Sequence, residues 1–199
     1  MKNNEFILIR VKEDYIDYLR QFDSKVQINS SKYDKDNKPF LGILFKINDL
    51  EYFVPFSSNK KGKLQNMFDT YIETNKKPID MFFVEDNSGK QRTLLSVLNI
   101  NNMIPIPEQA KIYFDIKEDK DYSLLIKELN YCKQNKETII KSAKRIYNAV
   151  KNHTWASLEK RCCDFILLEE KCLGFSIQKE NINNNSSERN IDLDIEFNI

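Results

Sequence analysis

The residues best suited to chemistry lie in one loop, where two serines are followed by two lysines. Ser57 and Ser58 come at the end of an apolar segment, and Lys60 and Lys61 follow after a single asparagine. Beyond a strand end, Ser58 and Lys60 can face a phosphate together, one as a hydroxyl and the other as a cation. Serines at such a position are often ordinary turn residues, and exposed lysines are often simply solvated. The loop is nevertheless the best candidate for chemistry in the chain.

Several classes of enzyme are difficult to build from this sequence. The chain has one histidine, His153, which argues against a two-histidine ribonuclease, a zinc site of several imidazoles and a histidine-paired cysteine protease. Its four glycines form neither a phosphate-binding loop nor a dinucleotide-binding motif. No acidic cluster has the spacing of metal ligands, so we expect neither a metal nor another cofactor.

Serine, lysine, tyrosine and asparagine in basic loops suit one reaction, the cleavage of RNA by its own 2′-hydroxyl. The substrate carries the nucleophile, so the protein needs to supply only alignment, charge neutralisation and proton transfer. The products would be a 2′,3′-cyclic phosphate and a 5′-hydroxyl, and DNA would be refused. Residue types alone leave open a non-catalytic nucleic-acid-binding module that uses the same basic surface.

Short strands are predicted along the first 116 residues, with turns between them. Asn48 and Asp49 tolerate positive φ and make a plausible hairpin turn, and Pro55, which cannot donate to a ladder, indicates an edge or a strand end. Gly89 is expected to supply positive φ in a second hairpin turn. A helix is predicted at 14–22, a helical turn near 64–71 and a polar loop at 27–38. The extended segments are 5–11, 39–47, 50–55, 80–84, 92–100, 103–107 and 111–116.

The pattern becomes helical toward the C-terminus. Apolar residues recur every three or four positions, which predicts one long helix or two contiguous ones over 121–151. A second helical pattern covers 155–173, where Gly174 is a reasonable stop. Cys162 and Cys163 fit the buried stripe of that pattern, so we expect reduced core thiols rather than disulfides or metal ligands.

These elements predict an α+β fold: a compact, strongly bent antiparallel β-barrel with added helices, two of them long and C-terminal. We expect a single domain over 1–177 and a disordered tail over 178–199, where Asn, Ser, Glu and Asp dominate. No apolar run is long enough to span a membrane, and the first residues do not resemble a signal peptide. The sequence therefore predicts a cytoplasmic protein without a membrane partner.

Two basic segments, separated in sequence, could form one surface that attracts polyanions. Between Lys25 and Lys63, eight lysines stand against four acids, and between Lys141 and Arg161 six bases stand against one acid. Lysines that merely keep the protein in solution would account for this distribution equally well.

Five stretches, in their order and spacing, resemble the ToxN/AbiQ family of endoribonuclease toxins, which belong to type III toxin–antitoxin and phage abortive-infection systems. Together they cover nearly all of residues 5–175, and the last is similar to the family's C-terminal helix signature. The stretches are Tyr15–Val26, Lys38–Ile43, Tyr52–Ser58, Leu98–Glu108 and Cys162–Cys172.

The resemblance implies a barrel related to the MazF/Kid toxins and metal-independent cleavage of RNA, cellular or phage, at adenine-rich sites. It also implies an RNA antitoxin, a small repeated RNA folded as a pseudoknot, which the toxin cuts from a precursor. Closed rings of alternating protein and RNA occur in the family. A MazF/Kid-type toxin neutralised by a protein antitoxin is the second alternative.

Carried over residue by residue, the family's essential serine falls on Ser58 and the hydroxyl before it on Ser57. The active-site lysine falls on Lys60, the loop lysine on Lys38 and the loop tyrosine on Tyr33. The chain has Phe-Ser-Ser where the family commonly has Leu-Thr-Ser, and a serine retains the hydroxyl of threonine.

On this interpretation Lys60, Lys38 and Lys61 hold phosphates, and Ser58 orients the scissile phosphate or the 2′-oxygen. A second set of residues is predicted to form the surface for the RNA antitoxin, with an imidazole and an indole available for stacking. These residues are Lys144, Arg145, Lys151, His153 and Trp155.

Overall fold

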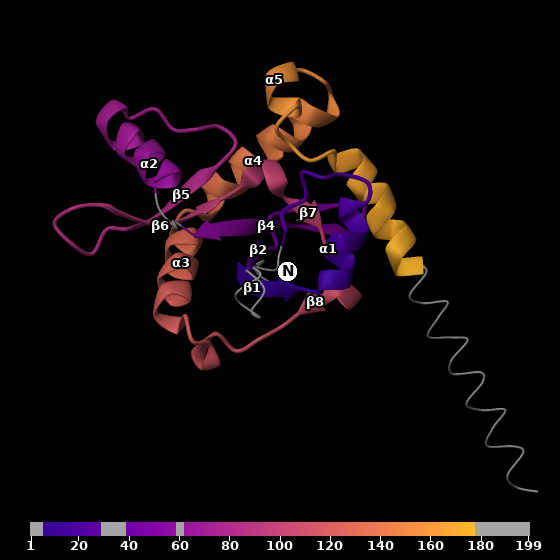
Figure 1. Cartoon of the computed structure of the whole chain (residues 1–199), viewed down its shortest axis with the longest axis horizontal. Coiled ribbons are helices and arrows are strands. Elements are labelled where there is room, and N and C mark those ends of the chain that lie inside the picture. Colours follow the sequence, from indigo (N-terminus) through magenta and orange to yellow (C-terminus); the bar gives the residue numbers. More distant parts are fainter. Residues whose placement is uncertain (1–5, 29–38, 59–61, 178–199) are drawn as a thin grey trace, which may run out of the picture.

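The structure, a computed structural model, describes residues 6–28, 39–58 and 62–177. Within these ranges one antiparallel sheet occupies the centre of the molecule and helices lie around it (Figure 1). Several predictions concern positions outside the described residues. These positions are most of the 27–38 loop, the 178–199 tail, the side chain of Ser58, and Tyr33, Lys38, Lys60 and Lys61.

Eight strands pair in this sheet in the order β5–β6–β4–β2–β1–β8, while β3 and β7 pair only with β4. The predicted strand at 39–47 is divided into two short strands, β2 and β3. The bounds are β1 Ile7–Val11, β2 Phe40–Gly42, β3 Lys46–Ile47, β4 Leu50–Ser58, β5 Phe82–Asp86, β6 Thr93–Leu98, β7 Ile104–Pro105 and β8 Lys111–Ile112.

The sheet is open. Every strand pair in the described chain is antiparallel, and the expected α+β class is confirmed. Closure into a barrel, however, was the wrong expectation for these residues. At one end β8 contributes only two residues to the sheet, and at the other end a helix packs against β5. The two end strands, β5 and β8, do not pair with each other.

Strand β4 passes through the middle of the sheet and leads to the predicted catalytic loop. The turn before it is confirmed, because Asn48 and Asp49 both have positive φ, 47° and 65°. The strand does not end at Pro55 but continues to Ser58. The Pro55 carbonyl accepts a hydrogen bond from the Asn99 backbone N–H at 3.1 Å, where the neighbour of β4 changes from β7 to β6. Proline has no N–H to donate back to Asn99, and the Asn99 carbonyl instead accepts a hydrogen bond from the Asn102 backbone N–H at 2.9 Å.

Helices cover the sheet and extend beyond it. Figure 1 shows α2 and the β5–β6 turn at one end of the molecule, and α1 with the last helix at the other. Of the two predicted alternatives for 121–151, two contiguous helices are correct, since Asn135 separates α3 from α4. No described helix is long and apolar enough to cross a membrane. The helices are α1 Glu13–Arg20, α2 Lys63–Thr74, α3 Tyr122–Gln134, α4 Lys136–Lys151, α5 Ala156–Glu159 and a helix over 165–177.

The predicted helix stop at Gly174 is wrong, because the last helix continues to residue 177. The next residue, Phe175, is buried, with its ring centroid 4.9 Å from that of Tyr15 and 5.2 Å from that of Tyr18. Glycine lowers helix propensity by about 1 kcal/mol, and this aromatic packing on α1 outweighs that cost.

The prediction for Gly89 is also wrong, since its φ is not positive and Gly62, just before α2, is the glycine that has positive φ, at 86°. The β5–β6 turn is held instead by Asp86, whose carboxylate accepts hydrogen bonds from the Ser88 backbone N–H at 2.9 Å and the Ser88 hydroxyl at 2.6 Å. An aspartate that bonds the backbone two residues later forms a turn without needing glycine.

Two clusters of buried side chains stabilise the fold. The main core fills the space between the sheet and α1, α3, α4 and the 165–177 helix, and a smaller one lies between α2 and the β5–β6 hairpin. All four cysteines are free and buried in the main core, as expected. Burial raises the pKa of Cys162 and of Cys163 to about 12, so these thiols stay protonated at neutral pH.

Candidate active site and nucleic-acid interface

Ser57 lies near the end of β4, and two side-chain amides hold its hydroxyl. The Ser57 Oγ accepts from Asn99 Nδ2 at 2.6 Å and from Gln27 Nε2 at 3.4 Å. The Asn99 amide also donates to Gln27 Oε1 at 2.8 Å, which closes a network of three side chains. A hydroxyl has two acceptor lone pairs and one proton. Because both lone pairs are occupied, the function left to Ser57 is to donate its proton.

The two amides come from segments far apart in the sequence. Asn99 directly follows β6, and its backbone N–H bond to Pro55 fixes it beside β4. Gln27 follows buried Val26 and anchors itself to β4, because its Nε2 also donates to the Phe56 carbonyl at 3.2 Å. Sequence analysis missed both residues, since an isolated Asn or Gln carries no spacing signal.

A buried aspartate positions the segment that carries Gln27. Asp23 is 7% exposed, and its Oδ1 accepts from the Lys25 backbone N–H at 2.8 Å. Its other oxygen accepts from the Asp164 backbone N–H at 2.7 Å, just before the 165–177 helix. The C-terminal part of the chain therefore helps to hold one wall of the candidate active site.

The backbone of Ser58 is paired with Ser96 of β6, and Ser96 is in turn paired with Val84 of β5. Behind this row lies Glu128 of α3, which is only 3% exposed and close to the Ser96 hydroxyl. Burial raises the pKa of Glu128 to about 7, and the nearby Asp121 carboxylate adds to the shift, whereas the Ser96 hydroxyl opposes it. The predicted core stripe of α3 contained the signal for this burial, because Glu128 lies three residues after Leu125 on the same helix face.

The predicted antitoxin surface is divided by the geometry of α4. Lys144, Arg145 and Lys151 are all exposed on this helix. Lys144 and Lys151 are seven residues apart and share a face, whereas Arg145 is turned away from Lys144 by about 100°. Arg145 lines a cavity beside β5, while Lys151 and His153 line a different cavity of about 650 Å³ near Cys162.

His153 ends helix α4. Its φ is 52°, its backbone N–H donates to the Val150 carbonyl at 3.1 Å, and the Thr154 N–H donates to the Ala149 carbonyl at 3.0 Å. These bonds form the Schellman motif that often ends a helix. The imidazole Nδ1 lies 2.8 Å from a carboxylate oxygen of Glu159, and RNA contact by His153 stays a prediction.

Trp155 is half-buried and packs against the main core, so only part of the indole is available for stacking. In the part of the chain that the structure describes, no group of three or more His, Cys, Asp or Glu side chains is placed to hold a metal ion.

Comparison with known proteins identifies the family. Residues 7–172 match the family described as Toxin ToxN, type III toxin–antitoxin system. The chain belongs to the ToxN family. The match begins at β1 and reaches into the last helix, so it includes the Gln27–Ser57–Asn99 network and every described element that holds it. The resemblance seen in the sequence is thereby confirmed.

Curated relatives of this ToxN-family chain are named endoribonucleases. Endoribonuclease ToxN of Bacillus thuringiensis subsp. kurstaki is 34% identical over 172 residues, which cover 81% of this chain and 80% of that protein. Endoribonuclease AbiQ of Lactococcus lactis subsp. lactis is 32% identical over 168 residues, covering 83% of this chain and 87% of that protein. The chain is therefore a member of a family of endoribonuclease toxins.

Solved structures agree with this assignment. One, described with selective toxin inhibition by a non-coding RNA pseudoknot, aligns with a TM-score of 0.71 at 30% identity and covers 87% of this chain and 99% of that chain. The structure of AbiQ, described as a lactococcal anti-phage endoribonuclease of a type III system, aligns with a TM-score of 0.70 at 26% identity, covering 86% and 98%.

Proposed function

We propose that this chain is a metal-independent endoribonuclease toxin that cuts RNA by attack of the 2′-hydroxyl on the adjacent phosphate. The observation that carries the proposal is the Gln27–Ser57–Asn99 network at the end of β4, in a chain of the ToxN family. The network holds a hydroxyl ready to donate at the end of β4, directly before Ser58. Such preorganised donors stabilise charge that develops on a phosphate.

Each candidate residue has a role in this reaction. Ser58 is the central hydroxyl and orients the scissile phosphate or the 2′-oxygen, and Ser57 donates its proton to a phosphate oxygen. Lys60, together with Lys38 and Lys61, neutralises the negative charge, and Tyr33 stacks on a base or shares in proton transfer. The products are a 2′,3′-cyclic phosphate and a 5′-hydroxyl.

An RNA antitoxin is the proposed partner. One similar structure is described with an inhibitory RNA pseudoknot, and another, at a TM-score of 0.66 and 26% identity, with a processed non-coding RNA that regulates a bacterial antiviral system. By analogy, a repeated pseudoknot RNA inhibits this chain, the exposed cations of α4 contribute to its binding, and adenine-rich sites in cellular and phage RNA are the substrates. Assembly into a protein–RNA ring follows the same analogy.

The same proposal covers the domain and its location. Residues 1–177 act as one toxin domain, because the C-terminal segment at Asp164 positions Asp23 and thereby Gln27. Four buried free thiols suit a reducing compartment, so the proposed location is the cytoplasm.

The decisive experiment compares Ser58→Ala with Ser88→Ala, which removes a hydroxyl from the exposed β5–β6 turn. Ser58→Ala is expected to abolish RNA cleavage and growth inhibition while the purified variant still binds RNA, whereas Ser88→Ala retains both activities. Wild-type cleavage should persist in EDTA and leave cyclic-phosphate ends. Undiminished toxicity of Ser58→Ala, or equal cleavage of a DNA strand, would refute the mechanism. Binding without cleavage would indicate a nucleic-acid-binding module, and neutralisation by a protein would indicate a MazF/Kid-type system.

A further inference from the structure

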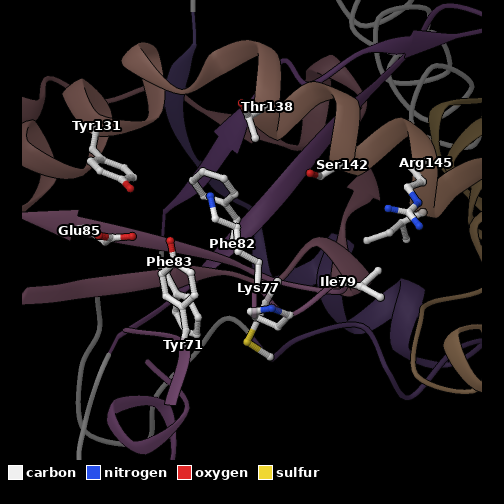
Figure 2. Close-up of a pocket in the computed structure, with 13 residues that line it drawn as sticks. Tyr71, Lys77, Ile79, Phe82, Phe83, Glu85, Tyr131, Thr138, Ser142 and Arg145 are labelled. Carbon is white, nitrogen blue, oxygen red and sulfur yellow. The ribbon is translucent and has the colours of Figure 1, made fainter. Parts of the chain in front are cut away.

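A cavity of about 200 Å³ lies beside the edge strand β5, between α2 and the helices α3 and α4. Its walls are mainly apolar and partly aromatic: Tyr71 and Phe82 approach from α2 and β5, and Tyr131 approaches from α3 (Figure 2). The ring centroids of Phe82 and Tyr131 are 6.3 Å apart. Thr138 and Ser142 of α4 add hydroxyls to the opposite wall. The cavity thus combines flat apolar surfaces with a few hydrogen-bonding groups.

Two cations stand at the rim of this cavity. Lys77 follows α2 and Arg145 is on α4, both are exposed, and Figure 2 shows them approaching from different elements. The Lys77 ammonium lies 5.8 Å from the centre of the Tyr71 ring. Each cation is within the lining of the cavity but open to water, which is the position that a phosphate contact requires.

The aromatic wall is held by an ion pair between Glu85, which is buried, and Arg92, which is exposed. Glu85 is 4% exposed and receives two hydrogen bonds from the Arg92 guanidinium, at 2.5 and 2.7 Å. The same guanidinium donates to the Tyr71 hydroxyl at 3.0 Å, and Tyr71 stacks on Phe83 with an interplanar angle of 19°. Burial, with the Glu85 carboxylate nearby, raises the pKa of Tyr131, so its hydroxyl stays neutral and able to hydrogen-bond. A fixed aromatic wall loses little entropy when it binds a flat ligand.

We propose that this cavity binds one unstacked base of RNA, with the neighbouring phosphates held by Lys77 and Arg145. Its volume is below the roughly 300–1,000 Å³ of pockets that enclose drug-sized ligands, so it accepts a ring system while the sugar and phosphates stay outside. Aromatic walls that stack on a base, with cations outside for the backbone, are the pattern of single-stranded RNA recognition. The inference rests on the proposed function and adds a binding site to it.

The cavity lies close enough to Ser58, at the end of β4, for one RNA strand to reach both. Val84, next to Glu85, is paired with Ser96, which is paired with Ser58. Two strand spacings correspond to about 10 Å, so the backbone of β5 is within a few nucleotides of the proposed cleavage point. We therefore assign to the cavity a base that flanks the cleaved bond or the corresponding base of the bound antitoxin.

The test uses the full chain and a short fluorescein-labelled RNA with 2′-O-methyl riboses, which the proposed chemistry cannot cut. Binding is followed by fluorescence anisotropy over a salt series. The Lys77→Ala/Arg145→Ala variant removes the two rim cations, and Lys76→Ala/Lys90→Ala is the control, because it removes the same charge from exposed positions outside the lining. A third variant, Ser142→Trp, fills the cavity and keeps both cations.

We expect the rim variant to weaken binding at least tenfold. The slope of log K against log salt concentration should fall by about 1.4, which is about 0.7 for each cation removed from a single-stranded RNA complex. The control should bind less than about threefold more weakly than the wild-type chain. Ser142→Trp should weaken binding at least fivefold, which a purely electrostatic surface would not show. Equal affinities of the rim variant and the control, or full affinity of a folded Ser142→Trp, would overturn the inference. Cleavage of ordinary RNA by the wild-type chain is measured in parallel, because its absence would refute the proposed function instead.

Discussion

Replacing Glu128 by Gln is expected to stabilise the chain in a pH-dependent way. The Glu128 carboxyl is 3% exposed in α3, next to Ser96, Asp121 and Cys132, and no described cation is among the groups that shift its pKa. Gln has nearly the same shape and never ionises. The substitution therefore removes the cost of a buried charge without creating a cavity.

The magnitude follows from the pKa of this carboxyl, which rises from its ordinary 4.5 to about 7 in the folded chain. Each tenfold change in proton affinity is worth about 1.4 kcal/mol, so ionising Glu128 costs the folded state about 3 kcal/mol. Between pH 4.5 and 7 the folded chain holds a proton that the unfolded chain has released, and the free energy of unfolding falls as the pH rises through this window. Above pH 7 the loss is complete.

Urea unfolding at a series of pH values from 5 to 8 measures the effect. Glu128→Gln should differ little from the wild-type chain at pH 5 and exceed its free energy of unfolding by up to about 3 kcal/mol at pH 8. Glu73→Gln, at an exposed position of α2, is the control and should give a difference that does not change with pH. A Glu128→Gln difference that stays constant or shrinks as the pH rises would refute the reasoning.

Three further substitutions test other parts of the structure. His153→Gly should stabilise the chain by about 1 kcal/mol in thermal or urea unfolding. His153 has a φ of 52°, and glycine adopts that conformation without strain. His153→Ala is the control and should give no gain in stability. Asn99→Ala should slow RNA cleavage in single-turnover assays and change the melting temperature little, because it frees the Ser57 hydroxyl from its 2.6 Å donor. Gly42→Ala should destabilise the fold by about 1–3 kcal/mol, or prevent folding, because an added Cβ would clash with the buried Phe53 ring. Unchanged urea unfolding would contradict that close contact.

Features that depend on local chemistry were predictable from the sequence. The Asn48–Asp49 turn needed only two residues that tolerate positive φ, and the two long helices needed only the apolar spacing along 121–151. The prediction at Gly174 was wrong because helix propensity is weak compared with the packing of the neighbouring Phe175 on α1. Sheet closure was wrong for a similar reason, since no local pattern shows whether the two end strands meet.

The candidate site was only partly predictable, because it combines short-range and long-range positions. Ser57 and the backbone of Ser58 belong to β4 itself, whereas the sequence placed them in a loop beyond a strand end at Pro55. Gln27 and Asn99 are 72 residues apart and meet only because β6 pairs with β4 while Asp23 ties the segment after α1 to the last helix. A single sequence shows that Gln27 and Asn99 are present but does not indicate that their side chains come into contact.

Counting basic residues along the sequence likewise does not show which of them share a surface. This affects how RNA binding should be tested. The cations of α4 were predicted as one surface, yet Lys144 and Lys151 share a face while Arg145 is turned by about 100° toward the cavity beside β5. Arg145 lines the cavity beside β5, and Lys144 and Lys151 do not, so an RNA strand bound between Ser58 and that cavity would contact Arg145 alone of the three. On the proposed function, Arg145→Ala should therefore weaken the binding of short RNAs that span the cleavage site. Lys144→Ala should weaken only the binding of an RNA large enough to wrap around α4. Equal losses for a short RNA would show that the two faces act as one.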